Sequence, residues 1–201
     1  MKTVIIGAGT TAIAVADILT QDRNITFAGF VGTEGEESIQ LEGAYKDLPL
    51  LAGHDYLDRL IEDGVGGFVV GVGDNRLREK RFYEASSAGL AAISAISPSA
   101  VIEPSVRIGS GAIISPGVVL CHGVEVGENT CLDPGVIIEG YTVVGENCYI
   151  GAGAIIGGKV KIGRGSFLGI RCTVTSFIQI GKNVSIPAGV IVQEDITDQL
   201  R

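Results

Sequence analysis

The chain has 201 residues and few aromatic, sulfur-containing or basic side chains, and these shortages argue against several kinds of binding site and partner. It has no Trp, two His and four Cys without CxxC spacing, so the sequence predicts no metal site. Fifteen basic residues stand against 23 acidic ones, and the net charge of −8 argues against nucleic acid as a partner. No apolar run approaches the ~20 residues of a membrane span, so we expect no membrane insertion. The N-terminus reads as a strand rather than a signal peptide, which predicts a cytoplasmic protein with reduced thiols.

Glycine is the residue in excess. The 30 Gly are roughly twice the average share, and they accompany 46% hydrophobic residues and only six Pro. Too little proline excludes collagen, and the aliphatic content excludes a disordered linker. The composition indicates many tight turns between short apolar runs.

An aliphatic residue returns at every sixth position from Ile96 to Val192, 17 times without a miss. A period of six fits neither a helix nor an alternating strand. It is typical of a left-handed parallel β-helix, in which each hexad supplies one short strand and one turn, and three hexads close a coil. We expect the first position to point inward and the small fifth position, including Cys148 and Cys172, to fill the space beside it. The Asn residues at corners suit φ > 0; they are Asn129, Asn147 and Asn183.

The first 95 residues alternate between strand and helix patterns instead. The expected strands are 3–6, 25–31 and 68–72, and the expected helices are 13–19, 55–62 and 75–87. Such alternation predicts a small parallel sheet, about half of a dinucleotide-binding fold. The predicted fold class is therefore an α/β half-Rossmann-like domain, 1–95, followed by an all-β left-handed β-helix, 96–201.

The turn after the first predicted strand reads Gly7-Ala8-Gly9-Thr10-Thr11-Ala12. Gly-x-Gly-x-x-Ala between a strand and a helix favours a phosphate at the helix N-terminus. A tight structural turn has the same pattern and stays an alternative. Because the sheet is so short, a single nucleotide or nucleotide sugar is favoured over NAD.

This domain order resembles the bacterial nucleotide-sugar acetyltransferases, which include sialic-acid O-acetyltransferase-like and bacillosamine or perosamine N-acetyltransferase-like proteins. Besides the first turn, the resemblance rests on residues 71–75 with Arg78, 97–100 and 160–169. It implies a homotrimer, with acetyl-CoA between neighbouring subunits and a nucleotide-linked amino-sugar on the front domain.

The resemblance also implies site residues, position by position. Those for the nucleotide sugar are Gly9, Thr10, Thr11, Gly32, Thr33, Gly73 and Arg76. Those for the coenzyme are Tyr149, Ile170 and Ala188. Thr11 stands where the family usually has His, and Gly32-Thr33 where it usually has Asp.

A larger departure concerns the catalytic base. The family carries a His followed by an acid where this chain has Gly140 and Tyr141, and that His is the expected general base. His122 lies one coil earlier at the same hexad position, so we predict it beneath Gly140, about 4.8 Å away, as a replacement base. One alternative is that His122 is a solvated corner residue. Another is that Glu139 orients or replaces the base. His54 is interpreted as a helix cap or surface residue.

The sequence thus predicts an acetyl-CoA-dependent N-acetyltransferase acting on a nucleotide-linked amino-sugar for a bacterial surface glycan. An amine acceptor is favoured over a hydroxyl because a neutral amine is already a competent nucleophile. One alternative is a catalytically silent trimeric scaffold that binds sugar nucleotides. Others are O-acetyl transfer, and transfer of another acyl group, with Tyr149 in place of a polar contact to the thioester.

Overall fold

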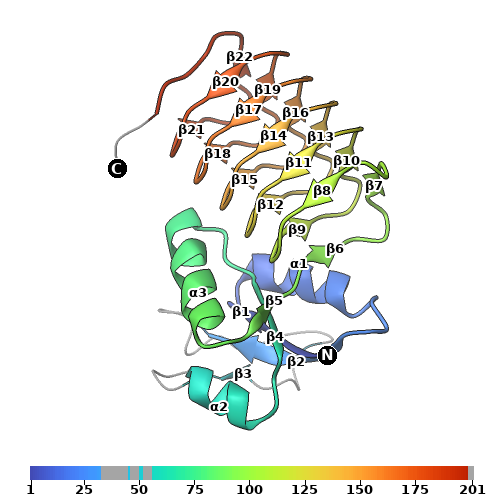
Figure 1. Cartoon of the computed structure of the whole chain (residues 1–201), viewed down its shortest axis with the longest axis vertical. Coiled ribbons are helices and arrows are strands. Elements are labelled where there is room, and N and C mark those ends of the chain that lie inside the picture. The colour runs from blue at the N-terminus through green and yellow to red at the C-terminus, as the bar shows by residue number, and fades with distance from the viewer. Residues whose placement is uncertain (33–44, 46–49, 52–55, 199–201) are drawn as a thin grey trace. The chain divides into compact units, whose positions relative to one another are not determined.

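In the computed structural model the chain divides into two compact units, Met1–Ala95 and Ile96–Arg201 (Figure 1). The structure describes residues 1–198 apart from 33–44, 46–49 and 52–55. Thr33 and His54 lie outside the described residues. An α/β unit is followed by a left-handed parallel β-helix, so the predicted fold class is confirmed.

The first unit is built on a parallel sheet in the order β3-β2-β1-β4-β5. Its strands are β1 (Lys2–Ile6), β2 (Thr26–Val31), β3 (Leu50–Leu51), β4 (Gly67–Val70) and β5 (Ala91–Ala92). Its helices are α1 (Thr10–Leu19), α2 (Tyr56–Glu62) and α3 (Asn75–Ser87). The sequence pattern does not predict β3 and β5, because two-residue strands carry no periodic signal. The predicted end of the third strand, at Val72, is wrong, since β4 ends at Val70.

The second unit has three faces, each a sheet of two-residue strands that pair with the strand 18 residues along the chain, as Ile137 pairs with Ile155 (Figure 1). The first face contains β6 (Ala95–Ile96), β9 (Ile113–Ile114), β12 (Cys131–Leu132), β15 (Tyr149–Ile150), β18 (Phe167–Leu168) and β21 (Ser185–Ile186). The second contains β7 (Val101–Ile102), β10 (Val119–Leu120), β13 (Ile137–Ile138), β16 (Ile155–Ile156), β19 (Thr173–Val174) and β22 (Ile191–Val192). The third contains β8 (Arg107–Ile108), β11 (Glu125–Val126), β14 (Val143–Val144), β17 (Lys161–Ile162) and β20 (Gln179–Ile180).

The aliphatic first positions form the core of this unit. Every one from Ile114 to Val192 is buried, and Ile102 and Ile108 are half-buried against them. Ile96, in the edge strand β6, is the exception at 40% exposed. Cys148 and Cys172 are fully buried at fifth positions, as predicted.

The chain turns at each corner through a residue in the left-handed region. The fourth residue of every hexad from 111 to 189 has φ between 52° and 73°. The three predicted Asn corners are among them. Four bulky residues adopt the same conformation, which the sequence did not predict; they are Tyr141, Lys159, Arg171 and Phe177.

No helix in the described part of the chain combines the length and the apolar character needed to cross a membrane.

Candidate active site

The turn between β1 and α1 offers a helix N-terminus to a ligand. Gly9 caps α1 in an extended conformation without a side-chain hydrogen bond, and the first turn of α1 carries no acidic residue. The N–H groups of a first helical turn have no partner within the helix and carry partial positive charge. Thr10 and Thr11 stand in this turn, which suits an anionic group such as a phosphate.

The sheet order gathers most of the predicted nucleotide residues at one edge. β1 lies between β2 and β4, so the carboxyl ends of these three strands are adjacent, at a change in strand order where ligands of α/β sheets bind. A Cβ placed on Gly73 would lie 3.6 Å from Thr11 Oγ1, so the loops after β1 and β4 lie next to each other. Gly32 directly follows β2, and Arg76 is exposed in the first turn of α3.

Two glycines allow these loops to approach each other. A Cβ on Gly7, whose φ is 120°, would lie 2.6 Å from the carbonyl oxygen of Gly71. A Cβ on Gly71 would lie 2.6 Å from Cα of Ala12 in α1. The spacing of small residues in the Gly-x-Gly-x-x-Ala turn therefore has a packing role as well as leaving room for a phosphate.

Arg78 holds the loop after β4 from inside the unit. Its side chain is fully buried, and its guanidinium donates to the carbonyls of Val72 and Gly73 (3.2 and 3.3 Å) and to Asn75 Oδ1 (2.7 Å). Asp74 caps α3 by accepting a hydrogen bond from the amide of Leu77. The loop that carries Gly73 is thus fixed at both ends.

In the second unit, the catalytic candidates lie on the second corner, which joins the second face to the third and contains residues 103–106, 121–124, 139–142, 157–160 and 175–178. His122 is 57% exposed, and its Nε2 lies 2.8 Å from where a Cβ on Gly140 would be. The predicted stacking of His122 beneath Gly140 is therefore observed. Because Gly140 has no side chain, the imidazole of His122 can occupy the space between the two residues.

Glu103 is a residue of this corner that sequence reasoning missed. Its Oε2 lies 3.7 Å from Nδ1 of His122, an ion-pair distance that is too long for a hydrogen bond. The carboxylate therefore faces one ring nitrogen while the other faces Gly140. Coil arithmetic would have found Glu103, because it lies one coil below Cys121, the neighbour of His122.

Glu139 turns away from the imidazole. Its Oε2 accepts a hydrogen bond from the amide of Gly158 (3.0 Å), on the coil above, and Ser176 Oγ lies 3.1 Å from the same amide. Cys121 sits between Glu103 and Glu139 in the stack. Burial and the two carboxylates raise the pKa of its thiol, which disfavours a thiolate nucleophile here.

Tyr141 stands beside the imidazole. The two rings meet edge to face with centroids 4.9 Å apart. The Tyr141 ring lies over Gly123, where a Cβ would come within 2.7 Å of it. Tyr141 therefore forms one wall of the space next to His122.

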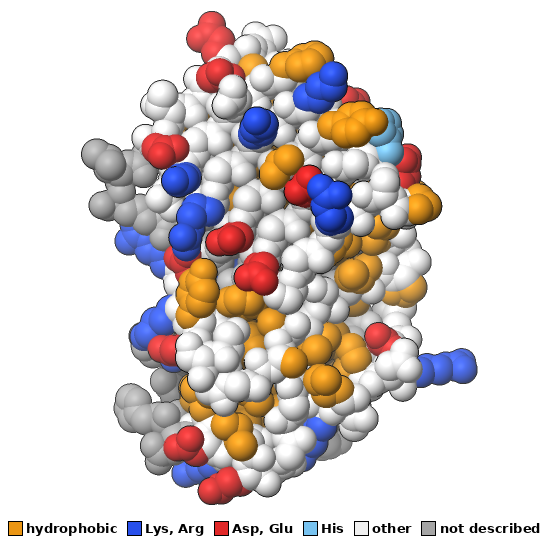
Figure 2. All heavy atoms as spheres, in the orientation of Figure 1, with side chains coloured by type: hydrophobic (Ala, Val, Ile, Leu, Met, Phe, Trp, Pro, Cys, Tyr) orange, Lys and Arg blue, Asp and Glu red, His pale blue; other side chains and the backbone are white. Residues whose placement is uncertain are grey.

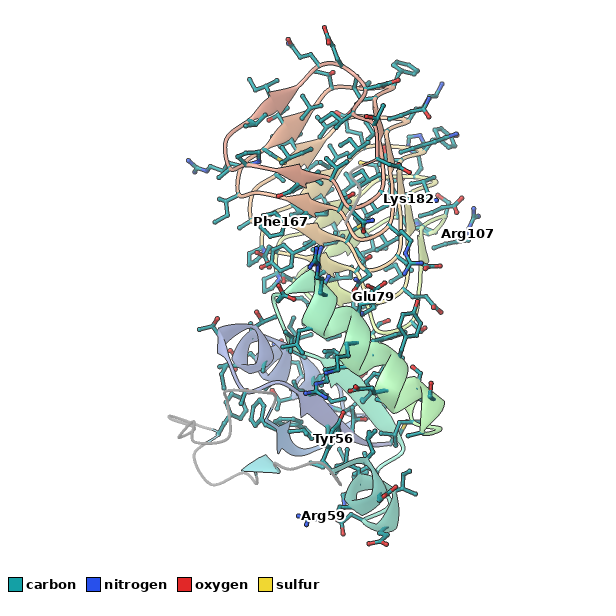
Figure 3. The ribbon with its side chains drawn as sticks, turned by 90° about the vertical axis from the view of Figure 1, so that its left-hand side faces the viewer. Tyr56, Arg59, Glu79, Arg107, Phe167 and Lys182 are labelled. Carbon is teal, nitrogen blue, oxygen red and sulfur yellow. The ribbon has the colours of Figure 1, made fainter. Side chains whose placement is uncertain are left out.

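The predicted coenzyme residues lie on the first face and on the first corner, which joins that face to the second. Tyr149, in β15, donates a hydrogen bond to Asp133 Oδ2 (2.7 Å) and stacks on Phe167, labelled in Figure 3, with centroids 5.3 Å apart. Ile170 and Ala188 are exposed one coil apart at equivalent positions of the first corner. The three residues thus share one edge of the β-helix.

Within one chain this edge and His122 are on different corners, separated by the second face. The outward residues of the second face form an almost unbroken aliphatic column, whereas those of the third face are mostly charged or polar. The second-face column is Val101, Val119, Ile137, Ile155, Thr173 and Ile191. The structure therefore does not bring the predicted base and the predicted coenzyme residues together in a single copy.

Among the described residues, no group of three His, Cys, Asp or Glu side chains is arranged to hold a metal ion. All four cysteines are free thiols.

Three family models match the chain. They are the PglD N-terminal domain over residues 2–85, the bacterial transferase hexapeptide (six repeats) over 123–158, and the hexapeptide repeat of succinyl-transferase over 159–194. Comparison with curated proteins gives no match.

Solved structures match the whole chain. One is a histidine-to-asparagine mutant of perosamine N-acetyltransferase from Caulobacter crescentus, in complex with CoA and GDP-perosamine. It is 30% identical with a TM-score of 0.90, and the match covers 100% of this chain and 92% of the perosamine N-acetyltransferase chain. The acetyltransferase domain of PglB from Neisseria gonorrhoeae, in complex with acetyl coenzyme A, is 24% identical with a TM-score of 0.84 and shares the fold over 98% and 93% of the two chains. WeeI from Acinetobacter baumannii has the same fold at 18% identity and a TM-score of 0.54, over 100% and 95%. With a relative of 30% identity matched along its length, the chain belongs to the family of nucleotide-sugar acetyltransferases with a left-handed β-helix.

Proposed function

We propose that this protein transfers the acetyl group of acetyl-CoA to the amine of a nucleotide-linked amino-sugar, as a step in bacterial surface-glycan synthesis. Family membership supports the acyl transfer, and the relative that binds CoA and GDP-perosamine supports the pair of substrates. The observation that carries the proposal is the His122 imidazole lying against Gly140, where the family's base is expected.

The two ring nitrogens of His122 have separate tasks. Nδ1 faces Glu103, whose negative charge orients the ring, while Nε2 faces the space above Gly140. The sugar amine attacks the thioester carbonyl and forms the C–N bond, and its proton passes to Nε2. The C–S bond then breaks, and the departing thiolate of CoA takes up a proton to leave as the thiol. Glu139 is the alternative base, although its carboxylate is engaged with Gly158.

The first unit holds the nucleotide in this proposal. The N–H groups at the start of α1, with Gly9, Thr10 and Thr11, suit the phosphate next to the nucleoside. Gly73 and Arg76 contribute from the loop after β4 and the first turn of α3. Gly32, which directly follows β2, completes the set together with Thr33, which lies outside the described residues.

The acyl-transfer site is completed by a second copy of the chain. The base and the coenzyme residues lie on the two corners that flank the aliphatic second face. In a homotrimer closed through that face, the second corner of one copy meets the first corner of the next. Acetyl-CoA on Tyr149, Ile170 and Ala188 of one subunit would then be presented to His122 of its neighbour.

The test is acetyl-CoA-dependent thiol release with GDP-perosamine, extended to UDP- and dTDP-linked amino-sugars. We expect turnover with at least one of them, and an amide product that resists hydroxylamine. His122→Ala should lower kcat/KM by about 10²–10⁴-fold. Unchanged turnover in His122→Ala would remove His122 from the mechanism and leave the reaction class intact.

A matched pair of variants tests the space above the imidazole. Gly140→Ala places a methyl group 2.8 Å from Nε2 and should displace the ring and lower kcat. Gly158→Ala, one coil above, meets its nearest heavy atom at 3.3 Å and should be better tolerated. Equal effects of the two changes would contradict the role of Nε2.

The second candidate is a silent sugar-nucleotide-binding scaffold, and the Gly140-Tyr141 pair in place of the family's His and acid favours it. Calorimetry separates the two functions. Binding of a nucleotide sugar without binding of acetyl-CoA, and without thiol release, would identify the scaffold.

A further inference from the structure

Three of the four bulky residues with left-handed backbone stand in one column. Tyr141, Lys159 and Phe177 are the fourth residues of three successive hexads on the second corner, each one coil from the next, with φ of 60°, 59° and 68°. The fourth such residue, Arg171, lies on the first corner. We call Tyr141, Lys159 and Phe177 the corner platform.

This conformation costs each bulky residue about 1–2 kcal/mol relative to Gly or Asn, the residues at the other corners from 111 to 189. The stacked backbone holds the residues in place, because each platform amide donates to a carbonyl of the coil below, as Phe177 does to Gly158 at 2.9 Å. Strain retained at three successive coils of one corner suggests a use for the side chains.

The platform side chains are exposed and mutually arranged. Tyr141 and Phe177 are 60% and 69% exposed. Figure 2 shows that hydrophobic side chains also reach the surface elsewhere among charged ones. The Lys159 ammonium lies over the Phe177 ring, 5.3 Å from its centroid. Such a cation–π contact restrains an otherwise flexible ammonium. Phe177 therefore positions Lys159, while Tyr141 lies beside His122.

We propose that the corner platform binds the sugar of the nucleotide-linked substrate and the phosphate next to it. Tyr141 packs against the apolar face of the sugar ring beside His122, and Lys159 binds the phosphate. This proposal rests on the proposed function and adds the part of the site that selects a phosphorylated sugar. His122 and Lys159 are two coils apart, about 10 Å at about 4.8 Å per coil, a distance that a sugar with its amine at one end and its phosphate at the other can bridge.

Charge favours this occupant over a second protein surface. Lys159 is the only Lys or Arg on the second corner, which also carries Glu103 and Glu139, and the whole chain is acidic at −8. A phosphate approaching this corner needs a cation, and Lys159 supplies one on the coil above Gly140. The aliphatic second face, which lacks charge, is the better candidate for contact between copies.

Substitution by Asn removes each side chain without disturbing the corner, because Asn adopts φ near 55° at three other corners. Tyr141→Asn and Lys159→Asn should raise the KM for GDP-perosamine, or for the best nucleotide amino-sugar, about threefold to tenfold and leave the KM for acetyl-CoA unchanged. Phe177→Asn should have a smaller effect of the same kind. All three should raise Tm, because strain is relieved. Weaker substrate binding with higher stability distinguishes a binding role from a structural one.

Two controls match these variants. Arg171→Asn, on the first corner, calibrates the gain in Tm from relieved strain. Lys182→Asn removes a charge from the third corner, which joins the third face to the first (Figure 3), and should leave the KM for the nucleotide sugar unchanged.

An unchanged nucleotide-sugar KM in Tyr141→Asn and Lys159→Asn, with normal turnover by the unmodified chain, would overturn the platform alone. Conversion of these variants to monomers in light scattering would assign the residues to a contact between copies and also overturn it. Absence of acetylation by the unmodified chain with every nucleotide amino-sugar would mean that the proposed function itself has failed.

Discussion

At the scale of single residues, the proposed mechanism depends on an imidazole with a different neighbour at each nitrogen. Glu103 lies on the coil below His122 and Gly140 on the coil above, so the stacking of coils sets both contacts. A carboxylate that faces Nδ1 favours the tautomer with its proton there, and this leaves Nε2 free to accept one. In the proposed mechanism Glu103 is therefore a positioning residue, acting through His122.

Glu103→Gln should lower kcat about 10-fold and leave both KM values unchanged, because ring orientation is lost while the binding surfaces remain. Glu103→Asp, which keeps the charge, should recover part of the activity. The populations of the two neutral tautomers, read by ¹⁵N NMR of His122, should shift toward Nε2–H in Glu103→Gln. A rise in KM with unchanged kcat would refute the positioning role.

The buried thiols predict how stability depends on pH. Burial raises the pKa of Cys172 from 9.0 to about 11, so the folded state keeps this thiol neutral where the unfolded chain would ionise. The unfolded state then binds fewer protons, and the free energy of unfolding falls as pH rises from 9 to 11, by at most about 1.4 kcal/mol per pH unit for this group. Urea unfolding at pH 8 and pH 10.5 should show a smaller loss in Cys172→Ala than in the unmodified chain. Equal losses would exclude this thiol as the cause.

At the scale of elements, each coil is joined to the next by backbone rungs and by hydroxyls at buried fifth positions. Thr142 Oγ1 donates to the carbonyl of Gly157 (2.8 Å) and accepts from the amide of Val160 (3.2 Å). Thr130 and Ser166 make the same pair of contacts on the third corner. A single hydroxyl thus satisfies two backbone groups that water does not reach.

Thr142→Val keeps the shape of the side chain and removes the hydroxyl. Two buried backbone groups lose this partner, so we expect a loss of about 1–3 kcal/mol in the free energy of unfolding, measured in urea. Thr142→Ser keeps the hydroxyl and should cost about 1 kcal/mol for the methyl group. A valine variant more stable than the serine variant would show that packing, and not the hydrogen bonds, holds these coils together.

A feature of the β-helix could be predicted from the sequence only where its residues carry a local pattern. The six-residue period predicted the coils and the inward Cys148 and Cys172, because periodicity reports which side faces the core. Asn183 signalled a left-handed corner, but Phe177, at an equivalent corner, did not, because bulky residues rarely adopt that conformation. There the stacked coils outweigh local preference. Glu103 was missed for a related reason, since its partner lies on another coil.

At the scale of the whole molecule, the three faces of the β-helix differ in what they present outward. Ile137 and Ile155 lie in the aliphatic column of the second face, while Arg107 and Lys161 lie on the third, where Arg107 points outward (Figure 3). The sequence contains both columns, but their placement relative to His122 becomes visible only when the coils are stacked. An exposed aliphatic face with the predicted base on one side and the predicted coenzyme residues on the other supports the proposed assembly of copies.

Mixed oligomers test this arrangement directly. His122→Ala removes the proposed base and keeps the edge that carries the predicted coenzyme residues Tyr149, Ile170 and Ala188 (the coenzyme edge). Ile170→Asp places a charge on the coenzyme edge and keeps the proposed base. Each variant alone should be nearly inactive. A trimer that contains both variants has one interface of three at which an intact base meets an intact coenzyme edge, so it should show about one third of normal activity. The chains are co-expressed with different tags and purified through both, and two differently tagged copies of His122→Ala are the control that should show no recovery. Inactive mixed trimers would mean that base and coenzyme edge do not meet between copies, because a site within one chain gains nothing from mixing.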